Sequence, residues 1–396
     1  MKKTISIIGG GAAAIMCACE LDTEKYEVTL YEKNKALGRK FLVAGKGGFN
    51  LTHSEDIESF VDRYTPKYFL SDAIQNFNNQ HLRNWLSENG ILTFIGSSKR
   101  VYPEKGIKPI EVLKAFESKM QTNKVHIKYS HNWLGWNESG SLNFDGHDEV
   151  RSDIVIFALG GGSWKVTGST GDWLGLFQDK GVAVAPFRAS NCNFKVDWDR
   201  ELIPKIEGLP LKNIAVSIDG VIQKGEAIIT KQGIEGNAIY ALSPMIRQSL
   251  DSKGEAVVGI DLKPIFDISK IKEKLNNSNY SKITEKLKNE LKISKVQIEL
   301  IKSITSKEEF NNIDFLAQII KNLPIKITGL SPIDEAISTV GGIALTEVNE
   351  NFELNKRPNH FCIGEMLSWD APTGGYLLQG CFSMGVAVAK VLNAKN

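Results

Sequence analysis

Cysteine is scarce in this chain of 396 residues, and the few cysteines present do not form a recognisable pair. There are five, an odd number, and none stands in a Cys-x-x-Cys spacing. A secreted protein held together by disulfides normally shows an even set at regular spacings, so this sequence indicates a reducing compartment. The sequence gives no support for a bound metal either.

The chain also lacks a long apolar run and a usable export signal. No segment approaches the roughly 18 apolar residues of a membrane span. The stretch from Met1 to Cys19 starts with two lysines, and Cys17 suggests a lipoprotein site. However, the glycines at 9–11 interrupt the helix that a signal peptide needs, and the bulky Met16 stands where a small residue is required. We therefore expect a cytoplasmic protein that does not associate with a membrane.

No excess of one charge sign is present. The 48 basic and 46 acidic residues are scattered and leave a formal charge of +2, so no basic stripe indicates nucleic acid as a partner. The Lys-rich and Asn-rich stretch 268–322 is interpreted as a solvated helix face. Composition is ordinary for a globular protein, and the length favours two or three domains. The sequence does not indicate an oligomeric state.

What the chain does contain is a compact βαβ pattern at its start. Residues 4–8 form an apolar run, 9–14 a glycine-rich turn, 11–21 an Ala-rich helical segment, and 27–32 a second strand. Parallel strands need a crossover of this kind. The fold class we predict is α/β, with a Rossmann-like first domain.

Later segments predict that this domain is discontinuous. We expect helices at 58–90 and 107–120, a small antiparallel meander at 125–136 and 141–144, and a buried strand at 154–158. Strands are expected to return at 336–342 and 360–363, with a closing helix at 380–392. The predicted first domain is therefore 1–190 plus 334–396, interrupted by an inserted domain at 191–333 that is β-barrel-like over 191–265 and helical over 266–333.

The turn after the first strand has the Gly-x-Gly-x-x-Ala spacing through Gly9, Gly11 and Ala14. These positions let the chain turn sharply, admit a pyrophosphate and bring the helix close to the strand. Glu32 lies at the end of the second strand, where a carboxylate can accept both ribose hydroxyls of an adenosine. The alternative interpretation of Glu32 is a solvated strand end.

A glycine-rich and cationic loop at 37–53 follows directly. Arg39 and Lys40 can neutralise a pyrophosphate, and exposed amides from Gly45 to Asn50 can approach a flat ring closely. The alternative is a mobile surface loop whose cations are solvated. At the other end of the chain, Gly374, Gly375 and Tyr376 can open the last helix, so that its amides face the N1/O2 edge of a flavin. Both chain ends together predict bound FAD.

Several motifs in the same order resemble one family. They are the turn at 9–14, the segments 38–40 and 50–53, 100–103, 160–164 with 167–172, 233–236, and Gly364-Glu365 followed by 372–376. In these motifs the chain is similar to the two-dinucleotide-binding-domain flavoproteins, a family that includes aminoacetone oxidase and a bacterial bile-acid dehydro-reductase. The resemblance implies FAD between the nucleotide fold and these loops, with the inserted domain covering the isoalloxazine.

The resemblance, together with the residue patterns, gives a set of candidate cofactor-binding residues. Trp133 enters it through a backbone contact to adenine that the family implies, although a buried aromatic in a meander is the alternative. The full set is Gly9, Gly11, Ala12, Ala13, Ala14, Glu32, Lys33, Arg39, Lys40, Gly45, Asn50, Leu51, Thr52, Trp133, Ala158, Gly160, Gly161, Thr170, Gly171, Gly364, Glu365, Gly374, Gly375 and Tyr376.

Two departures from the family pattern fall where a flavin or substrate would be touched. Gly48-Phe49 stands in place of Arg-Cys, and Trp164-Lys165 in place of Tyr-Pro. The substrate of a relative is therefore not transferred. His53 is a candidate acid or base, but a lone histidine after a turn more often caps or packs. No catalytic residue is assigned.

The function expected is an FAD-dependent oxidoreductase that transfers a hydride between the flavin and a small organic substrate. No second Gly-x-Gly-x-x-Gly follows a predicted strand, so NAD(P)H is expected at most as a transient electron donor. Two alternatives stay open: a flavin-dependent RNA-modifying or RNA-binding protein, and a flavin redox sensor without turnover.

Overall fold

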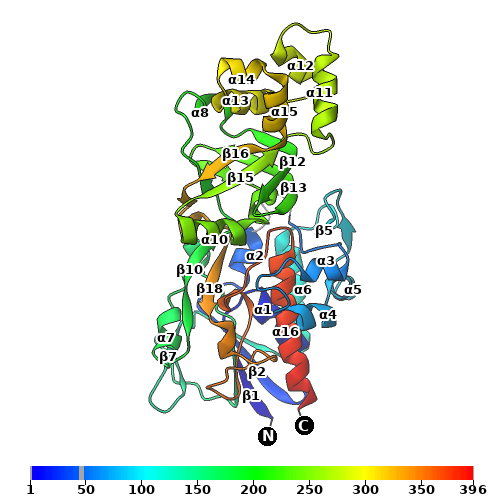
Figure 1. The fold of residues 1–396 in the computed structure, drawn as a ribbon. Coiled ribbons are helices and arrows are strands. Elements are labelled where there is room, and N and C mark those ends of the chain that lie inside the picture. Colours follow the sequence, from blue (N-terminus) through cyan, green and yellow to red (C-terminus); the bar gives the residue numbers. More distant parts are fainter. Residues whose placement is uncertain (1, 44–48, 396) are drawn as a thin grey trace. The chain divides into compact units, whose positions relative to one another are not determined.

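A computed structural model describes residues 2–43 and 49–395 of the chain (Figure 1). It divides into two compact units. Unit 1 combines both ends of the chain, Met1–Ser190 with Ile333–Asn396, and unit 2 is the intervening segment Asn191–Pro332.

The centre of unit 1 is a parallel sheet with the strand order β19-β9-β1-β2-β6. Its strands are β1 (Lys3–Ile8), β2 (Tyr26–Glu32), β6 (His126–Tyr129), β9 (Ile154–Phe157) and β19 (His360–Cys362). Every residue of β9 is buried, as expected for a parallel strand covered on both faces. The strand at 126–129 was predicted in an antiparallel meander, but it pairs parallel to β2 instead.

The helices that cover this sheet come from opposite ends of the chain. They are α1 (Ala12–Glu20), α6 (Pro109–Thr122) and α16 (Tyr376–Ala394). Helix α1 packs against α16, and Tyr26 Oη donates to Leu392 O at 2.7 Å. Helix α16 starts at Tyr376, four residues before the helical pattern predicted at 380–392 but at the residues predicted to open the last helix, because Gly375 forms its N-cap in a left-handed conformation (φ 105°).

Among the described residues, α16 is the one helix long and apolar enough to cross a membrane, with a mean hydropathy of 1.3. The sequence analysis predicted no such segment. Sixty-one per cent of this helical stretch is buried within the protein, as in the core helix of a folded domain.

Shorter elements surround the sheet of unit 1. The predicted helical region 58–90 consists of three short helices, since Asp56 and Asn78 each cap a new helix. The strand predicted at 336–342 pairs antiparallel with β10, outside the parallel sheet. These elements are α2 (Arg39–Val43), β3 (Thr52–His53), α3 (Ile57–Val61), α4 (Ser71–Asn76), α5 (Asn79–Glu88), β4 (Thr93–Ile95), β5 (Arg100–Pro103), β7 (Trp133–Trp136), β8 (Leu142–Phe144), η1 (Lys165–Thr167), α7 (Leu174–Gln178), β10 (Val184–Ser190), η2 (Ile333–Glu335), β18 (Ser338–Ile343), η3 (Leu345–Glu347) and η4 (Gly364–Met366).

Unit 2 contains a seven-stranded antiparallel sheet with the order β16-β15-β12-β13-β14-β11-β17. Its two edge strands are separated in sequence by Thr328 alone, so the sheet must curl until its edges approach each other, as in a barrel. Its elements are β11 (Phe194–Lys195), α8 (Ile203–Ile206), β12 (Pro210–Ile218), β13 (Val221–Thr230), β14 (Gly233–Glu235), α9 (Asn237–Tyr240), α10 (Ser243–Lys253), β15 (Ala256–Asp261), α11 (Ile268–Asn276), α12 (Ile283–Glu290), α13 (Lys295–Ser303), α14 (Lys307–Asn311), α15 (Ile313–Lys321), β16 (Leu323–Ile327) and β17 (Gly329–Leu330).

Candidate functional site

A cavity of about 490 Å³ lies in unit 1 at the carboxyl ends of the parallel strands. Ile8, Glu32, Ala158 and Ile363 line it, and each stands at or just after the end of a strand of the sheet. From β1 the chain runs outward on one side to β2, while β9 and β19 lie on the other side. The cavity therefore lies at the point where the strand order reverses, the usual ligand position in open α/β sheets.

The β1–α1 turn forms one wall of this cavity. Gly9 has φ 102°, and a Cβ there would lie 2.5 Å from Ala158 O, so only glycine fits between the strands. Gly11 is different, because it has φ −84° and a Cβ there would meet nothing within 4 Å. Among the described residues no side chain caps the N-terminus of α1. Its first amides therefore remain available to an anion.

The Glu32 carboxylate is buried at the end of β2 and is held by backbone and side-chain donors. Gly10 N donates to Oε2 at 2.8 Å. Asn34 donates twice to Oε1, from its backbone N at 2.8 Å and from Nδ2 at 2.5 Å. A carboxylate offers about four acceptor sites. Three are used here, so the remaining one, on Oε2, suits one hydroxyl rather than the two predicted.

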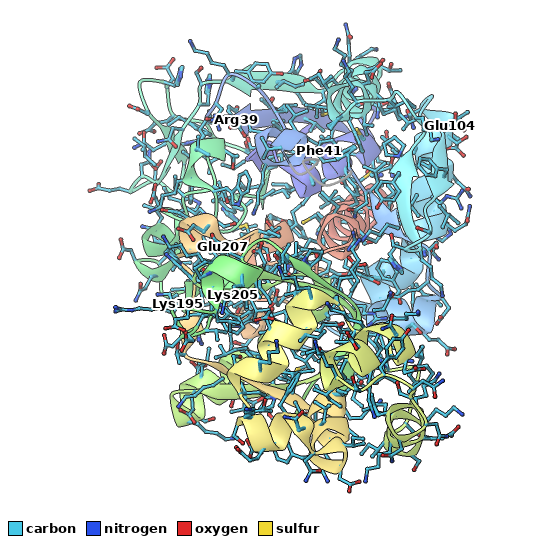
Figure 2. The ribbon with its side chains drawn as sticks, turned by 90° about the horizontal axis from the view of Figure 1, so that it is seen from above. Arg39, Phe41, Glu104, Lys195, Lys205 and Glu207 are labelled. Carbon is cyan, nitrogen blue, oxygen red and sulfur yellow. The ribbon has the colours of Figure 1, made fainter. Side chains whose placement is uncertain are left out.

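Arg39 and Lys40, both on α2, line the cavity but already have partners. Arg39 donates from Nη1 to Asn34 Oδ1 at 2.6 Å and from Nη2 to Val166 O at 2.8 Å. Lys40 Nζ donates to Ser163 Oγ at 3.0 Å and pairs with Glu365 at 3.2 Å. Figure 2 marks Arg39 near Phe41 of the same helix. These cations bind other protein groups rather than standing free for a pyrophosphate.

The loop after β9 forms a second wall. Gly160 and Thr170 line the cavity, and Lys33 Nζ donates to Thr170 Oγ1 at 3.3 Å. Gly161 and Gly171 do not line it. A Cβ at Gly161 would lie 2.2 Å from Thr339 Oγ1, and one at Gly171 would lie 2.8 Å from the Phe187 ring. These two glycines therefore allow close packing of the loop.

Aromatic residues close one end of the cavity. Trp133 and His131 line it, and the His131 ring lies 5.5 Å from that of Tyr31, another lining residue. The indole of Trp133 packs on Trp136 and Phe157 with centroid distances of 4.8 Å each. Trp133 Nε1 is buried without a hydrogen-bond partner among the described residues. Its indole N–H therefore faces the aromatic cluster rather than open cavity.

The predicted cofactor residues divide into those that the structure brings to this cavity and those that it does not. Lining it are Gly9, Gly11, Ala12, Ala13, Glu32, Lys33, Arg39, Lys40, Trp133, Ala158, Gly160, Thr170, Gly364 and Glu365. Outside the lining are Ala14, Asn50, Leu51, Thr52, Gly161, Gly171, Gly374, Gly375 and Tyr376. Gly45 lies outside the described residues.

Close backbone packing explains the position of the C-terminal glycines. A Cβ at Gly375 would lie 2.4 Å from Thr52 C, so the start of α16 is pressed against β3. The first residues of α16 that reach the cavity are Leu377 and Leu378, followed by Cys381. Burial raises the pKa of the Cys381 thiol, so this thiol stays protonated.

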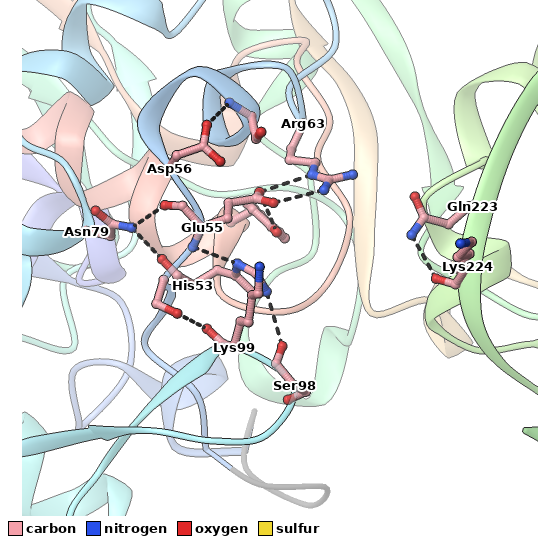
Figure 3. A network of polar contacts seen from close by, with 12 residues as sticks. His53, Glu55, Asp56, Arg63, Asn79, Ser98, Lys99, Gln223 and Lys224 are labelled. Atoms are coloured by element: carbon pink, nitrogen blue, oxygen red, sulfur yellow. Dashed lines mark hydrogen bonds and ion pairs between the residues drawn. The ribbon is translucent and has the colours of Figure 1, made fainter. Parts of the chain in front are cut away.

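Tyr376 takes part in a polar network with Glu55 and Arg63, two residues that are labelled in Figure 3. The Tyr376 hydroxyl donates to Glu55 Oε1 at 2.7 Å. Arg63 donates to the same carboxylate, from Nε to Oε1 at 3.0 Å and from Nη2 to Oε2 at 2.8 Å. Burial raises the pKa of Glu55, but the hydrogen bonds from Arg63 and Tyr376 outweigh it, so the net pKa is lowered. The carboxylate is thus ionised and fixed.

His53 takes part in the same network as a packing residue. Glu55 N donates to its Nδ1 at 3.2 Å, which leaves Nε2 to donate to Ser98 O at 3.2 Å. Its ring stacks on Tyr376 at 5.2 Å. Burial lowers its pKa, so the ring is neutral near physiological pH. Both ring nitrogens are engaged, which does not suit an acid or base in turnover.

The residues at the two departures from the family pattern have different surroundings, since Phe49 is buried and Lys165 is exposed. Phe49 is buried, and its ring meets Phe41 edge-on at 4.8 Å, while Gly48 lies outside the described residues. Trp164 precedes η1 with a left-handed φ of 60°, and Lys165 pairs with Asp334 at 3.6 Å.

Sequence reasoning missed several residues that line the cavity. Asn34 carried a signal, since an Asn two residues after a strand-end carboxylate commonly closes a local turn. Asp172 lay within the motif segment 167–172, whereas His131 and Ile337 carried no signal, because only the tertiary fold brings them to the cavity. The missed residues are Ile8, Gly10, Tyr31, Asn34, Ala36, Gly38, Phe41, His131, Asn132, Leu134, Leu159, Thr167, Gly168, Ser169, Asp172, Trp173, Leu176, Ile337, Ile363, Leu377, Leu378 and Cys381.

Comparison with known families matches this architecture from end to end. A model described as the HI0933-like protein Rossmann domain matches residues 3–391. The chain belongs to the HI0933-like family. Membership accounts for the strand order of unit 1 and for the glycine turn at its switch point, and it covers unit 2 as well.

Individual relatives of this HI0933-like chain are distant but of full length. A ribosomal RNA dihydrouridine synthase of Haemophilus influenzae is 25% identical over 97% of this chain and 96% of its own. A 3-dehydro-bile acid delta(4,6)-reductase of Clostridium scindens is 23% identical over 96% and 97%. A 3-ketosteroid-delta4-(5alpha)-dehydrogenase structure from Rhodococcus jostii has a TM-score of 0.50 at 14% identity, covering 98% and 97%, which shows a shared fold.

Proposed function

We propose that this HI0933-like protein is an FAD-dependent oxidoreductase that moves a hydride between the bound flavin and an organic substrate, with NAD(P)H as the electron donor. The observation that carries the proposal is the cavity at the switch point, where the uncapped start of α1 and the buried Glu32 carboxylate lie together. The start of α1 can bind an anion, and the Glu32 carboxylate can bind a hydroxyl. An adenosine diphosphate group offers both, in its pyrophosphate and its ribose.

The residues present fit such a dinucleotide. The open space over Gly11 is a cradle that any side chain would partly fill, so a pyrophosphate suits it. The free acceptor on Glu32 Oε2 suits a ribose hydroxyl. Tyr31, His131 and Trp133 supply aromatic surface for an adenine. Gly364 and Glu365 would hold the flavin half together with α16.

When bound, the flavin supplies the ability to accept or donate a hydride. The chain's own residues prepare the surroundings for it. Leu377, Leu378 and Ile363 present apolar surface that excludes water from the cavity. Among the described residues no side chain caps the N-terminus of α16, so its partial positive charge favours negative charge nearby. Lys40 and Glu365 hold each other in a fixed orientation.

The substrate class that we propose is a compound with a carbon–carbon double bond conjugated to a carbonyl. The names of two relatives support this choice. Reducing the Δ4,6 bonds of a 3-dehydro bile acid and forming dihydrouridine both add two hydrogens across such a bond. A hydride donor in an apolar cavity is suited to either reaction.

Anaerobic spectroscopy of the purified protein tests the proposal. We expect a yellow protein whose flavin absorbance bleaches with NADH or NADPH and returns when a 3-oxo-4-ene steroid or another enone is added. The variant Glu32→Ala should bind FAD more weakly. Its Kd for FAD should rise about tenfold or more, because a charged hydrogen bond is lost. Glu24→Ala, an exposed carboxylate of the same βαβ unit, is the matched control. A colourless protein that takes up no added FAD would refute the proposal.

A second candidate function is reduction of a uracil in ribosomal RNA. Two relatives support it, the dihydrouridine synthases of Haemophilus influenzae and of Escherichia coli, the latter 23% identical over 98% of this chain. The balanced charge of the chain is the opposing observation. Incubating the NAD(P)H-reduced protein with deproteinised ribosomal RNA and measuring dihydrouridine by mass spectrometry decides between RNA and a small molecule.

A further inference from the structure

We infer that Arg39 and Asn34 form a relay that orients the Glu32 carboxylate for the ribose, so that both are positioning residues for the cofactor. The inference rests on the proposed FAD binding. It assigns Arg39 a role through Asn34 and Glu32, in place of the pyrophosphate contact that its position in the sequence suggests.

A chain of hydrogen bonds joins the loop after β9 to the carboxylate, with Arg39 donating to both of its neighbours. Val166 O accepts from Arg39 Nη2 at 2.8 Å, and Arg39 Nη1 donates to Asn34 Oδ1 at 2.6 Å. Asn34 Nδ2 then donates to Glu32 Oε1 at 2.5 Å. The segment from Glu32 to Arg39 is thus joined to the loop at Val166, which is distant in sequence, at one wall of the cavity.

The chemistry of the two neighbours fixes the orientation of the Asn34 amide. A guanidinium has only donors, and a carboxylate has only acceptors. Asn34 stands between them, so only the orientation with Oδ1 toward Arg39 and Nδ2 toward Glu32 satisfies both. With Arg39 removed, Asn34 Oδ1 loses its donor, and among the described residues the side-chain amide is held only by its hydrogen bond to Glu32.

The relay matters because it decides which acceptor site of Glu32 stays open. Asn34 occupies both sites of Oε1 through its backbone and side-chain nitrogens. Gly10 N takes one site of Oε2. The carboxylate cannot rotate without losing these bonds, so one acceptor on Oε2 is presented in a fixed direction. Such preorganisation lowers the cost of binding a hydroxyl.

The loop after β9 also packs on this relay. A Cβ at Gly168 would lie 2.7 Å from Asn34 Nδ2, and Gly168 has φ 97°, so the loop approaches the amide as closely as glycine allows. Arg39 is the residue that links this loop to the amide. Lys33 lies beside it, lines the same cavity and bears the same charge, but it bonds only to Thr170 Oγ1, at 3.3 Å, among the described residues.

The decisive variant is Asn34→Asp, which keeps the size of the side chain and replaces the donor with an acceptor. The Kd values for FAD and for ADP are measured by flavin fluorescence and calorimetry. We expect Asn34→Ala to raise them about tenfold, and Asn34→Asp to raise them by more. The Kd of Arg39→Met should rise about threefold to tenfold, whereas that of Lys35→Met, the control at an exposed lysine outside the cavity lining, should change less than about twofold.

A double-mutant cycle separates positioning from a purely structural role. If Asn34 acts through Glu32, Asn34→Ala should have little further effect on the Kd for ADP in the Glu32→Ala background. Additive effects of the two substitutions, or equal Kd values for Asn34→Asp and wild type, would overturn the relay. Failure of wild type to bind either FAD or ADP would instead refute the proposed function.

Discussion

At the scale of single residues, Gly9 and Gly11 stand two positions apart in the turn but are glycines for opposite reasons. Gly9 is required by the fold, because its φ of 102° and the nearby Ala158 O leave no place for a side chain. Gly11 has an ordinary φ of −84° and open space beside it. The protein itself tolerates a methyl group there, and only a ligand in the cavity would not.

This difference predicts different failures for two similar substitutions. Gly9→Ala should destabilise the fold by about 2 kcal/mol or more, because a left-handed backbone and a steric clash both oppose it. Gly11→Ala should keep the stability within about 1 kcal/mol of wild type but weaken FAD binding at least tenfold. Urea unfolding without cofactor and a flavin titration measure the two effects. Normal FAD binding by Gly11→Ala would show that no phosphate lies over this turn.

Some single residues of the site could be predicted from the sequence and others could not. The spacing of Gly9, Gly11 and Glu32 follows from local geometry that any βαβ turn must satisfy, so it could be predicted. The partners of Arg39 and Lys40 could not, because Val166 and Glu365 reach them only through the tertiary fold. A cation beside a predicted anion site looks identical in sequence whether it binds the ligand or another residue.

At the scale of elements, the start of α16 is fixed by a hydrogen bond to a partly buried ion pair rather than by a capping side chain. The Glu55 carboxylate accepts from Arg63 and from Tyr376, the first residue of the helix. Its pKa is lowered below the usual 4.5 by these hydrogen bonds, against the opposing effect of burial. The network therefore connects the segment after β3 to the helix that reaches the cavity.

This network predicts an acid-sensitive contribution to stability. Because the folded pKa of Glu55 lies below its unfolded value, the contribution is complete above about pH 4.5 and is lost as the pH falls through the folded pKa. Glu55→Gln should cost about 1–3 kcal/mol at neutral pH. The difference from wild type should shrink below pH 4.5 in urea unfolding. A difference that is independent of pH would contradict the ionised pair.

The contact between α1 and α16 is a second element-scale feature that can be tested. A Cβ at Gly385 would lie 2.6 Å from Ala13 O and 2.9 Å from Cys17 N. Gly385→Ala should therefore destabilise by about 1–3 kcal/mol, although alanine favours a helix by about 1 kcal/mol over glycine. The exposed Lys390→Ala on the same helix is the control in thermal unfolding. A stabilised Gly385→Ala would mean that the helices can move apart freely.

Element types were predictable where periodicity was strong, and pairing partners were not. The buried run at 154–157 and the strand at 26–32 lie as predicted. The segment 126–129 was assigned to the wrong sheet, because the sequence of a short strand does not indicate which strand it pairs with. Similarly, helices α3 to α5 were predicted as one helical region, and between α4 and α5 the cap Asn78 interrupts the amphipathic pattern only briefly.

At the scale of the whole molecule, unit 1 is assembled from both ends of the chain, and its cavity takes residues from each. Added FAD should therefore slow hydrogen exchange in β1, α1 and β2 together with η4 and the start of α16. Saturating FAD at about 100 times Kd should also stabilise the fold by about 2.7 kcal/mol. Exchange mass spectrometry measures this pattern. Protection confined to residues 2–43 would show that the C-terminal segment does not take part.

This division of unit 1 has a consequence for biosynthesis. The nascent chain completes β9 at Phe157, but its neighbour β19 begins only at His360. At roughly 5–20 residues per second, a ribosome needs about 10–40 s to supply the missing edge strand. Unit 2 emerges entirely within that interval. The first four strands of the sheet must therefore wait with the β9 edge unpaired, and the cofactor cavity is completed only after Cys381 has been made.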